Sequence, residues 1–255
     1  MERITSWIRH QLGVLRSRVI YYWQPGKIAL LTRFFAEYLP PNALCFDIGA
    51  HLGNRTKVWR KLGARVIAVE PQEACLRFLH KQFGQDEQVT ILPVAVASES
   101  GEKLLYVSAI TPTITTLADK EWQTDMQELS SFHVQWDYTV PVKTVTLEEL
   151  VQTYGVPDFC KIDVEDLELE VLMGLHTALP LLSFEYLSAR ITKTLACIER
   201  LEELGQYEYN WSFGESHQME SMEWLPAQNI LDILKLYTRE NRSGDIYARL
   251  ISTLN

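Results

Sequence analysis

Long apolar runs and paired cysteines are both missing from this 255-residue chain. No window approaches the ~18 uninterrupted apolar residues that a membrane-spanning helix needs. Near the start, apolar residues are interrupted by four arginines, which does not fit a secretory signal peptide: Arg3, Arg9, Arg16 and Arg18. The four cysteines stand far apart and form no C-x-x-C pair, at positions 45, 75, 160 and 197. They indicate reduced core residues in a cytoplasmic protein, not a disulfide framework or a zinc site.

Two reactive arrangements are also absent. The chain has no G-x-S-x-G turn, so covalent hydrolysis through a serine is not expected. Its six histidines share no spacing with acids that would indicate a metal centre. A net charge of −9 argues against a broad nucleic-acid surface. What remains is an acidic globular protein with no nucleic-acid partner expected.

The first 33 residues depart from this acidic balance, with six Lys/Arg against the single acid Glu2. Apolar residues recur at helical spacing: Ile4, Ile8, Leu12, Leu15, Val19 and Tyr22. Two readings stay open for this helix. It lies peripherally on a membrane surface, or it packs over the rest of the chain or over a second copy in a homodimer.

From residue 43 onward, short apolar runs alternate with helical segments. We expect strands at 43–48, 65–70, 89–96, 158–164 and 181–186, and two closing strands at 207–213 and 245–251. Helices are expected at 55–62, 73–82, 167–179, 193–204 and 227–237. This order predicts an α/β fold with a mostly parallel sheet and helices on both faces.

Residues 101–146 interrupt the alternation. They begin with an expected strand at 103–107 and continue as a long polar stretch containing Trp122, Phe132, His133, Trp136 and Tyr138. Insertions of this length in α/β proteins commonly cover a ligand. A lid over the substrate and a surface excursion with its own small core both stay open.

The stretch "CFDIGAHLGN" places Asp47 at the end of the first expected strand, followed by Gly49 and Gly53. In parallel sheets, ligands bind beyond the carboxyl ends of the strands. About twenty residues later a second strand ends on Glu70, where an acid can bind ribose hydroxyls. A dinucleotide site would need a third glycine where Asp47 stands. A carboxylate there would repel a pyrophosphate but attract the ammonium of S-adenosylmethionine, which is the cofactor we expect.

A second acidic group follows in "DFCKIDVEDLELEVLMGL" and "LSFEYL". Asp163 and Glu185 close two further strands and are expected to face the same cleft. Either carboxylate can accept a proton from a substrate hydroxyl. The alternative for Asp163 and Glu165 is capping of the helix that follows. A metal between Asp163, Glu165 and Glu185 is conceivable, but nothing in their spacing requires one, and we expect none.

These motifs resemble the FkbM family of S-adenosylmethionine-dependent methyltransferases. The resemblance covers about residues 43–250 and is carried by "FDIGAHLGN", "VIAVEP", "LPVAVASESG", "VKTVTLEEL", "KIDVEDLELEVLMG" and "SFE". It implies the class I methyltransferase sheet of seven strands with the last antiparallel. It also implies a methionine pocket shaped by Asp47, Gly49, Ala50 and Gly53, a ribose site at Glu70 and Pro71, and an adenine site at Val94 and Ala95. Asp163 would lie near the reactive methyl group.

The sequence departs from the family pattern at two positions. His51 stands where asparagine is frequent, as a structural residue or as a base. Asp166 stands where glycine is usual after "DVE", which leaves the substrate class more open than the cofactor.

We therefore predict a helical region at 1–42 and one methyltransferase domain at 43–255, with 101–146 as its insertion. The expected reaction is O-methylation of a sugar or secondary metabolite, with Asp163, Glu185 and His51 as candidate catalytic residues. Two rivals remain: a catalytically silent scaffold of the same fold at a membrane surface, and an NAD-dependent oxidoreductase.

Overall fold

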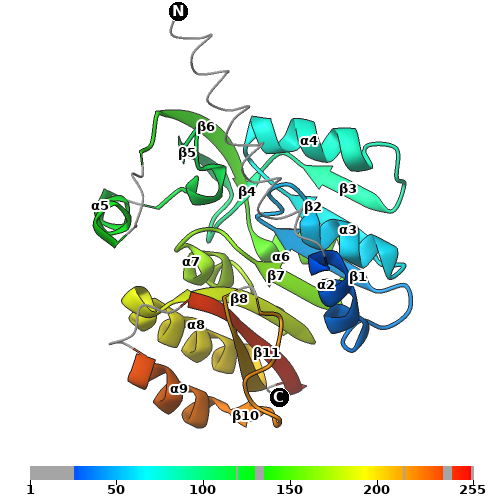
Figure 1. Ribbon diagram of the computed structural model, residues 1–255, viewed down its shortest axis with the longest axis vertical. Helices are drawn as coiled ribbons and strands as arrows, with labels where there is room; N and C mark the ends of the chain where they lie inside the picture. Colours follow the sequence, from blue (N-terminus) through cyan, green and yellow to red (C-terminus); the bar gives the residue numbers. More distant parts are fainter. Residues whose placement is uncertain (1–25, 119, 130–134, 215, 238–242, 254–255) are drawn as a thin grey trace, which may run out of the picture.

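The central feature of the fold is a sheet of eight strands in the order β10-β9-β11-β8-β7-β1-β2-β3 (Figure 1). The structure, a computed structural model, describes residues 26–118, 120–129, 135–214, 216–237 and 243–253. The strands are β1 (Leu44–Ile48), β2 (Arg65–Val69), β3 (Val89–Leu92), β7 (Phe159–Ile162), β8 (Leu181–Leu187), β9 (Gly205–Phe213), β10 (Leu225–Pro226) and β11 (Ser243–Thr253).

Strand directions confirm the expected fold class. β3, β2, β1, β7 and β8 pair in parallel, and β11 inserts antiparallel between β8 and β9. Seven strands were expected, and the eighth is the two-residue edge strand β10, which pairs with β9. The expected strand 89–96 is wrong in extent, because β3 ends at Leu92. Pro93, which has no N–H to donate, follows. The chain then enters β4 (Ala95–Val96) in a different sheet.

Helices cover both faces of the main sheet (Figure 1). On one face lie α2 (Lys27–Ala36), α3 (Asn54–Lys61) and α4 (Glu73–Phe83). On the other lie α6 (Leu147–Tyr154), α7 (Glu168–Met173), α8 (Ile191–Leu204) and α9 (Ala227–Leu236). In β1, Cys45 packs on the first face and Phe46 on the second, and both side chains are fully buried. Burial on both sides explains why the strand reads as a continuous apolar run.

Helix α7 is shorter than the predicted helix 167–179, which was wrong at its C-terminal end. It ends at Met173, and Gly174 follows. A Cβ at Gly174 would lie 2.6 Å from the carbonyl oxygen of Ala97. The chain therefore passes close to the loop after β4 at this point, a tertiary contact that helical periodicity does not reveal.

The insertion forms a second sheet beside the main one (Figure 1). β5 (Gly101–Val107) and β6 (Tyr138–Val145) pair antiparallel, and β4 joins β6 in parallel. Between them lie η1 (Pro112–Ile114) and α5 (Lys120–Leu129). Trp122 and Trp136 pack edge to face, with ring centroids 5.6 Å apart. Phe132 and His133 lie outside the described residues, as does the apolar stripe of residues 4–22. Among the described helices, none has the length and apolar character needed to cross a bilayer.

Candidate active site

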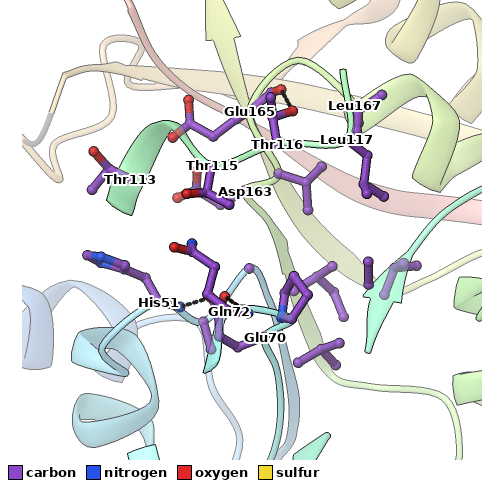
Figure 2. A pocket seen from close by; sticks show the side chains of 18 of the residues that line it. His51, Glu70, Gln72, Thr113, Thr115, Thr116, Leu117, Asp163, Glu165 and Leu167 are labelled. Carbon is purple, nitrogen blue, oxygen red and sulfur yellow. Dashed lines mark hydrogen bonds between the residues drawn. The ribbon is translucent and has the colours of Figure 1, made fainter. Parts of the chain in front are cut away.

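A cavity opens at the carboxyl ends of β1, β2, β7 and β8. Its volume is about 130 Å³. Figure 2 shows His51, Glu70 and Gln72 on one side and Thr113, Thr115, Thr116 and Glu165 on the other. Of the predicted site residues, it gathers Gly49, Ala50, His51, Glu70, Pro71, Val94, Ala95, Asp163 and Glu185.

The turn after β1 brings the backbone very close to the end of β7. Gly49 has φ +80°, and a Cβ there would lie 1.8 Å from the carbonyl oxygen of Asp163. The amides of Gly49 and Ala50 both donate to the carbonyl of Val69, which ties the turn to β2. Only glycine fits such a contact at this φ, so Gly49 defines the floor of the cavity.

Gly53 and Asp47 are not among the cavity-lining residues. Gly53 precedes α3 with φ +74°, and a Cβ there would lie 2.7 Å from Leu79, so it permits close packing of α3 on α4. Asp47 is 2% exposed, and its carboxylate accepts hydrogen bonds from the amide and hydroxyl of Thr56 at 3.1 and 2.5 Å. Asp47 fixes the first turn of α3 beneath the cavity, and its binding of the cofactor ammonium stays a prediction.

Glu70 is held rigidly at the end of β2. It is 2% exposed, and its two carboxylate oxygens accept 2.8 Å hydrogen bonds from the amides of His51 and Gln72. Burial raises its pKa to about 7, despite these two donors, which act in the opposite direction. Because both donors are backbone groups, the carboxylate has a fixed orientation at the cavity wall.

His51 lines the cavity with φ +50°. Burial, together with the positive charge of Arg55, lowers the pKa of its imidazole to about 4. The ring is therefore neutral at physiological pH. The neutral ring can accept or donate a hydrogen bond in the cavity, but it adds no charge to the lining.

Asp163 belongs to a closed ring of charges that sequence reasoning did not find. Its carboxylate lies 3.2 Å from Arg55 and 3.5 Å from Lys161, and Asp245 lies 2.7 Å from Lys161 and 3.8 Å from Arg55. Lys161 is 1% exposed, whereas the Asp163 side chain is 24% exposed. The one sequence signal is Lys161 itself, a lysine inside an apolar strand that must find a counter-charge when buried.

Glu165 and Glu185 approach Asp163 from two elements. Each of the three carboxylates offers an oxygen within 4.8 Å of the others. Burial raises the pKa of Glu165 and of Glu185 well above the usual range, and the neighbouring carboxylates raise both further. This end of the cavity therefore carries an excess of acid over base.

In the loop after β7, the side-chain contacts differ from the helix capping considered for Asp163 and Glu165. Glu165 and Asp166 both adopt left-handed conformations, with φ +56° and +77°. The Asp166 carboxylate pairs with Arg190 and Lys193. Glu168, not Glu165, accepts the amide of Val164, at 3.1 Å. The glutamate at 165 is thereby left to line the cavity.

The insertion forms the wall of the cavity opposite the turn that follows β1 (Figure 2). Residues 112–117 contribute Pro112, Thr113, Thr115, Thr116 and Leu117 to its lining. The segment is tied at both ends: the Gln72 side chain donates to the carbonyl of Pro112, and the Thr116 hydroxyl donates to the carbonyl of Glu165, both at 2.9 Å. It therefore bridges the loops after β2 and β7.

Residues 47–191, more than half of the chain, match the family described as the methyltransferase FkbM domain. Several solved structures are similar. A precorrin-6Y C5,15-methyltransferase from Geobacter metallireducens is 14% identical, with TM-score 0.45 over 87% of this chain and 85% of its own. A SAM-dependent O-methyltransferase from Thermotoga maritima is 11% identical, with TM-score 0.44 over 93% and 71%. A TehB-like SAM-dependent methyltransferase from Corynebacterium glutamicum is 11% identical, with TM-score 0.43 over 87% of both chains. No curated protein sequence matches the chain.

Proposed function

The chain belongs to the FkbM methyltransferase family, and from this premise we propose that it transfers a methyl group from S-adenosylmethionine to a hydroxyl oxygen of a sugar or secondary metabolite. The observation that carries the proposal is Glu70. Its carboxylate is buried, oriented by two backbone amides and placed in the lining of the cavity. An acid so placed after the second strand is suited to bind the two ribose hydroxyls of a nucleoside cofactor.

The residues present fit this cofactor along the length of the cavity. Gly49 lets the turn after β1 pack directly against the end of β7, because a Cβ there would collide with the backbone of Asp163. Val94, Ala95, Val96 and Leu105 provide an apolar wall for adenine beyond Glu70 and Pro71. When bound, the cofactor supplies a methyl group on a positively charged sulfur.

The charge of the cavity favours a sulfonium cofactor over a dinucleotide. Its described lining contains four carboxylates, Glu70, Asp163, Glu165 and Glu185, against one permanent cation, Arg55. A pyrophosphate would add two negative charges to this surface, whereas a sulfonium is attracted to it. This electrostatic balance counts against the oxidoreductase alternative.

The chain's own contribution to methyl transfer is mainly orientation. Holding an acceptor oxygen in line with the methyl group removes much of the entropic barrier to a reaction between two molecules. Residues 112–117 are suited to this task because they form the cavity wall opposite the turn after β1. Thr113 and Thr115 lie there opposite His51 (Figure 2), so the acceptor is expected between these two sides.

The test is incubation with S-adenosylmethionine carrying a labelled methyl group and a panel of glycosides and hydroxylated metabolites. We expect a labelled methyl ether from at least one acceptor, and none from Glu70→Ala. Glu73→Ala is the matched control, because Glu73 is exposed on α4 and does not line the cavity. Label found only on nitrogen or carbon would refute O-methylation while leaving the cofactor assignment intact.

A further inference from the structure

The acid-rich end of the cavity contains two kinds of carboxylate. Asp163 is balanced by two cations, Arg55 and Lys161. In contrast, neither the Glu165 nor the Glu185 side chain makes an ion pair or hydrogen bond with any residue in the described parts of the chain. All three line the same cavity. The two glutamates are therefore the groups whose charge is left to be balanced by something else.

Asp163 is committed to ion pairs. Its carboxylate lies 3.2 Å from Arg55 and 3.5 Å from Lys161, and together with Asp245 it compensates the charge of Lys161, which is fully buried. A buried charge that loses its partner is costly, so the ring of Arg55, Asp163, Lys161 and Asp245 holds this carboxylate in place. The sequence interpretation placed Asp163 first as a base, whereas these contacts favour a role in balancing Arg55 and Lys161.

Glu165 and Glu185 have the opposite electrostatics. Both side chains are half-buried and offer oxygens within 4.8 Å of each other, and two carboxylates so placed do not readily ionise together. The charged groups that act on them from the packed elements are Asp163 and Lys161 at β7, Glu168 of α7 and Asp245 of β11. Three of these four are acids. Arg190 and Lys193 lie near the same loop but are paired with Asp166.

We propose that Glu165 and Glu185 share one proton before the cofactor binds, release it when the sulfonium enters the cavity, and then accept the proton of the acceptor hydroxyl. The inference rests on the proposed function and deepens it, because it adds Glu165 to the catalytic residues. In the transfer, the new C–O bond forms as the S–C bond breaks, and the S–C electron pair remains on sulfur. The O–H electron pair stays on oxygen, and the proton passes to the glutamate pair.

This cycle keeps the charge of the cavity constant during the chemical step. The sulfur loses its positive charge as the glutamate pair gains one proton. The proton is then held until the next sulfonium displaces it. No further base, metal or co-reactant is needed to balance the reaction.

The proton can be counted by calorimetry without knowing the acceptor. S-adenosylmethionine and S-adenosylhomocysteine are each titrated into the protein in two buffers of different ionisation enthalpy, at one neutral pH. The two ligands share the adenosine and amino acid parts, so protons displaced from Glu70 by the ribose cancel in the comparison. We expect the sulfonium ligand to release more protons than the neutral one, with an excess approaching about one proton per site.

Three variants test whether the excess protons come from the pair Glu165 and Glu185. Glu165→Gln and Glu185→Gln should each abolish it, because a single remaining carboxylate has no partner with which to share a proton. Glu168→Gln is the matched control and should retain it. Glu168 begins α7, directly after the loop, and burial raises its pKa to about 7, but it does not line the cavity.

Equal proton release by the two ligands in the wild type would overturn the inference, and so would an excess that survives in both Gln variants. Binding of neither ligand to the folded wild type would instead refute the proposed function on which the inference rests.

Discussion

Replacing Lys161 by methionine tests the ring of charges beneath the cavity. The variant keeps the length and most of the apolar contacts of the side chain but removes the ammonium that lies 2.7 Å from Asp245 and 3.5 Å from Asp163. Lys161 is 1% exposed and the Asp245 side chain 9%. Asp245 would keep only Arg55, at 3.8 Å, as an ion-pair partner among the described residues.

The expected loss of stability follows from the burial of Lys161 and Asp245. Removing one partner of a buried ion pair typically costs about 3–5 kcal/mol, because the remaining charge is left uncompensated. Because Lys161 is almost inaccessible to water, this energy is not greatly reduced by solvent screening. We expect Lys161→Met to lower the free energy of unfolding by about 3–5 kcal/mol. The double variant Lys161→Met/Asp245→Asn removes both charges and should recover at least ~1 kcal/mol of the loss.

The effect should also depend on pH in a defined direction. Burial alone would lower the pKa of Lys161, but the negative charges of Asp163 and Asp245 outweigh it and raise the pKa above 10.5. A raised lysine pKa contributes stability that is fully present below the unfolded value and is lost as the pH rises through the folded value. The difference between wild type and Lys161→Met should therefore be constant near neutral pH and shrink in strong alkali.

Urea denaturation followed by circular dichroism measures these differences. A single variant within ~1 kcal/mol of the wild type at neutral pH would refute the reasoning, because it would mean that Lys161 carries no buried charge. A double variant less stable than the single one would show that Asp245 contributes through contacts other than its pairing with Lys161.

Three further predictions concern the cavity. Gly49→Ala should lower the thermal unfolding midpoint and abolish binding of S-adenosylhomocysteine, because its Cβ would lie 1.8 Å from the oxygen of Asp163; a stable variant with normal binding would contradict the close contact. Asp166→Gly should be more stable towards urea than Asp166→Ala by about 1 kcal/mol, because both lose the ion pairs but only glycine tolerates the left-handed conformation; equal stabilities would argue that the conformation carries no strain. Binding of S-adenosylhomocysteine should tighten as the pH rises through about 7, the pKa of Glu70, because the ionised form accepts hydrogen bonds from ribose; Glu70→Gln should flatten this profile, and a persistent slope would assign it to another group.

The sequence was sufficient to predict the fold because the strands of the main sheet are buried on both faces. Cys45 and Phe46 face opposite cores, which produces an apolar run that needs no tertiary information to recognise. The limits of α7 and β3 were wrong for two different reasons. The end of α7 reflects the close approach of Gly174 to Ala97, a tertiary contact that the sequence does not reveal. The end of β3 falls just before Pro93, a break that the sequence itself contains.

The candidate site was predictable in its location but less so in its roles. Acids at strand ends indicate a cleft, because parallel strands present their carboxyl ends at one edge. Which acid lines that cleft depends on side-chain direction and partners. Asp47 is bound by Thr56 in the next helix. Asp163 pairs with Lys161, whose second partner is Asp245, 84 positions further along the chain. No spacing within one motif could reveal that second partnership.

The central claim is that the cavity binds S-adenosylmethionine through Glu70. Its most direct test is calorimetric binding of S-adenosylhomocysteine to the wild type, to Glu70→Ala and to the exposed control Glu73→Ala. The account predicts micromolar binding to the wild type and the control, about −8 kcal/mol, and a loss of at least tenfold in Glu70→Ala. Equal affinity in all three proteins, or no binding to a folded wild type, would contradict it.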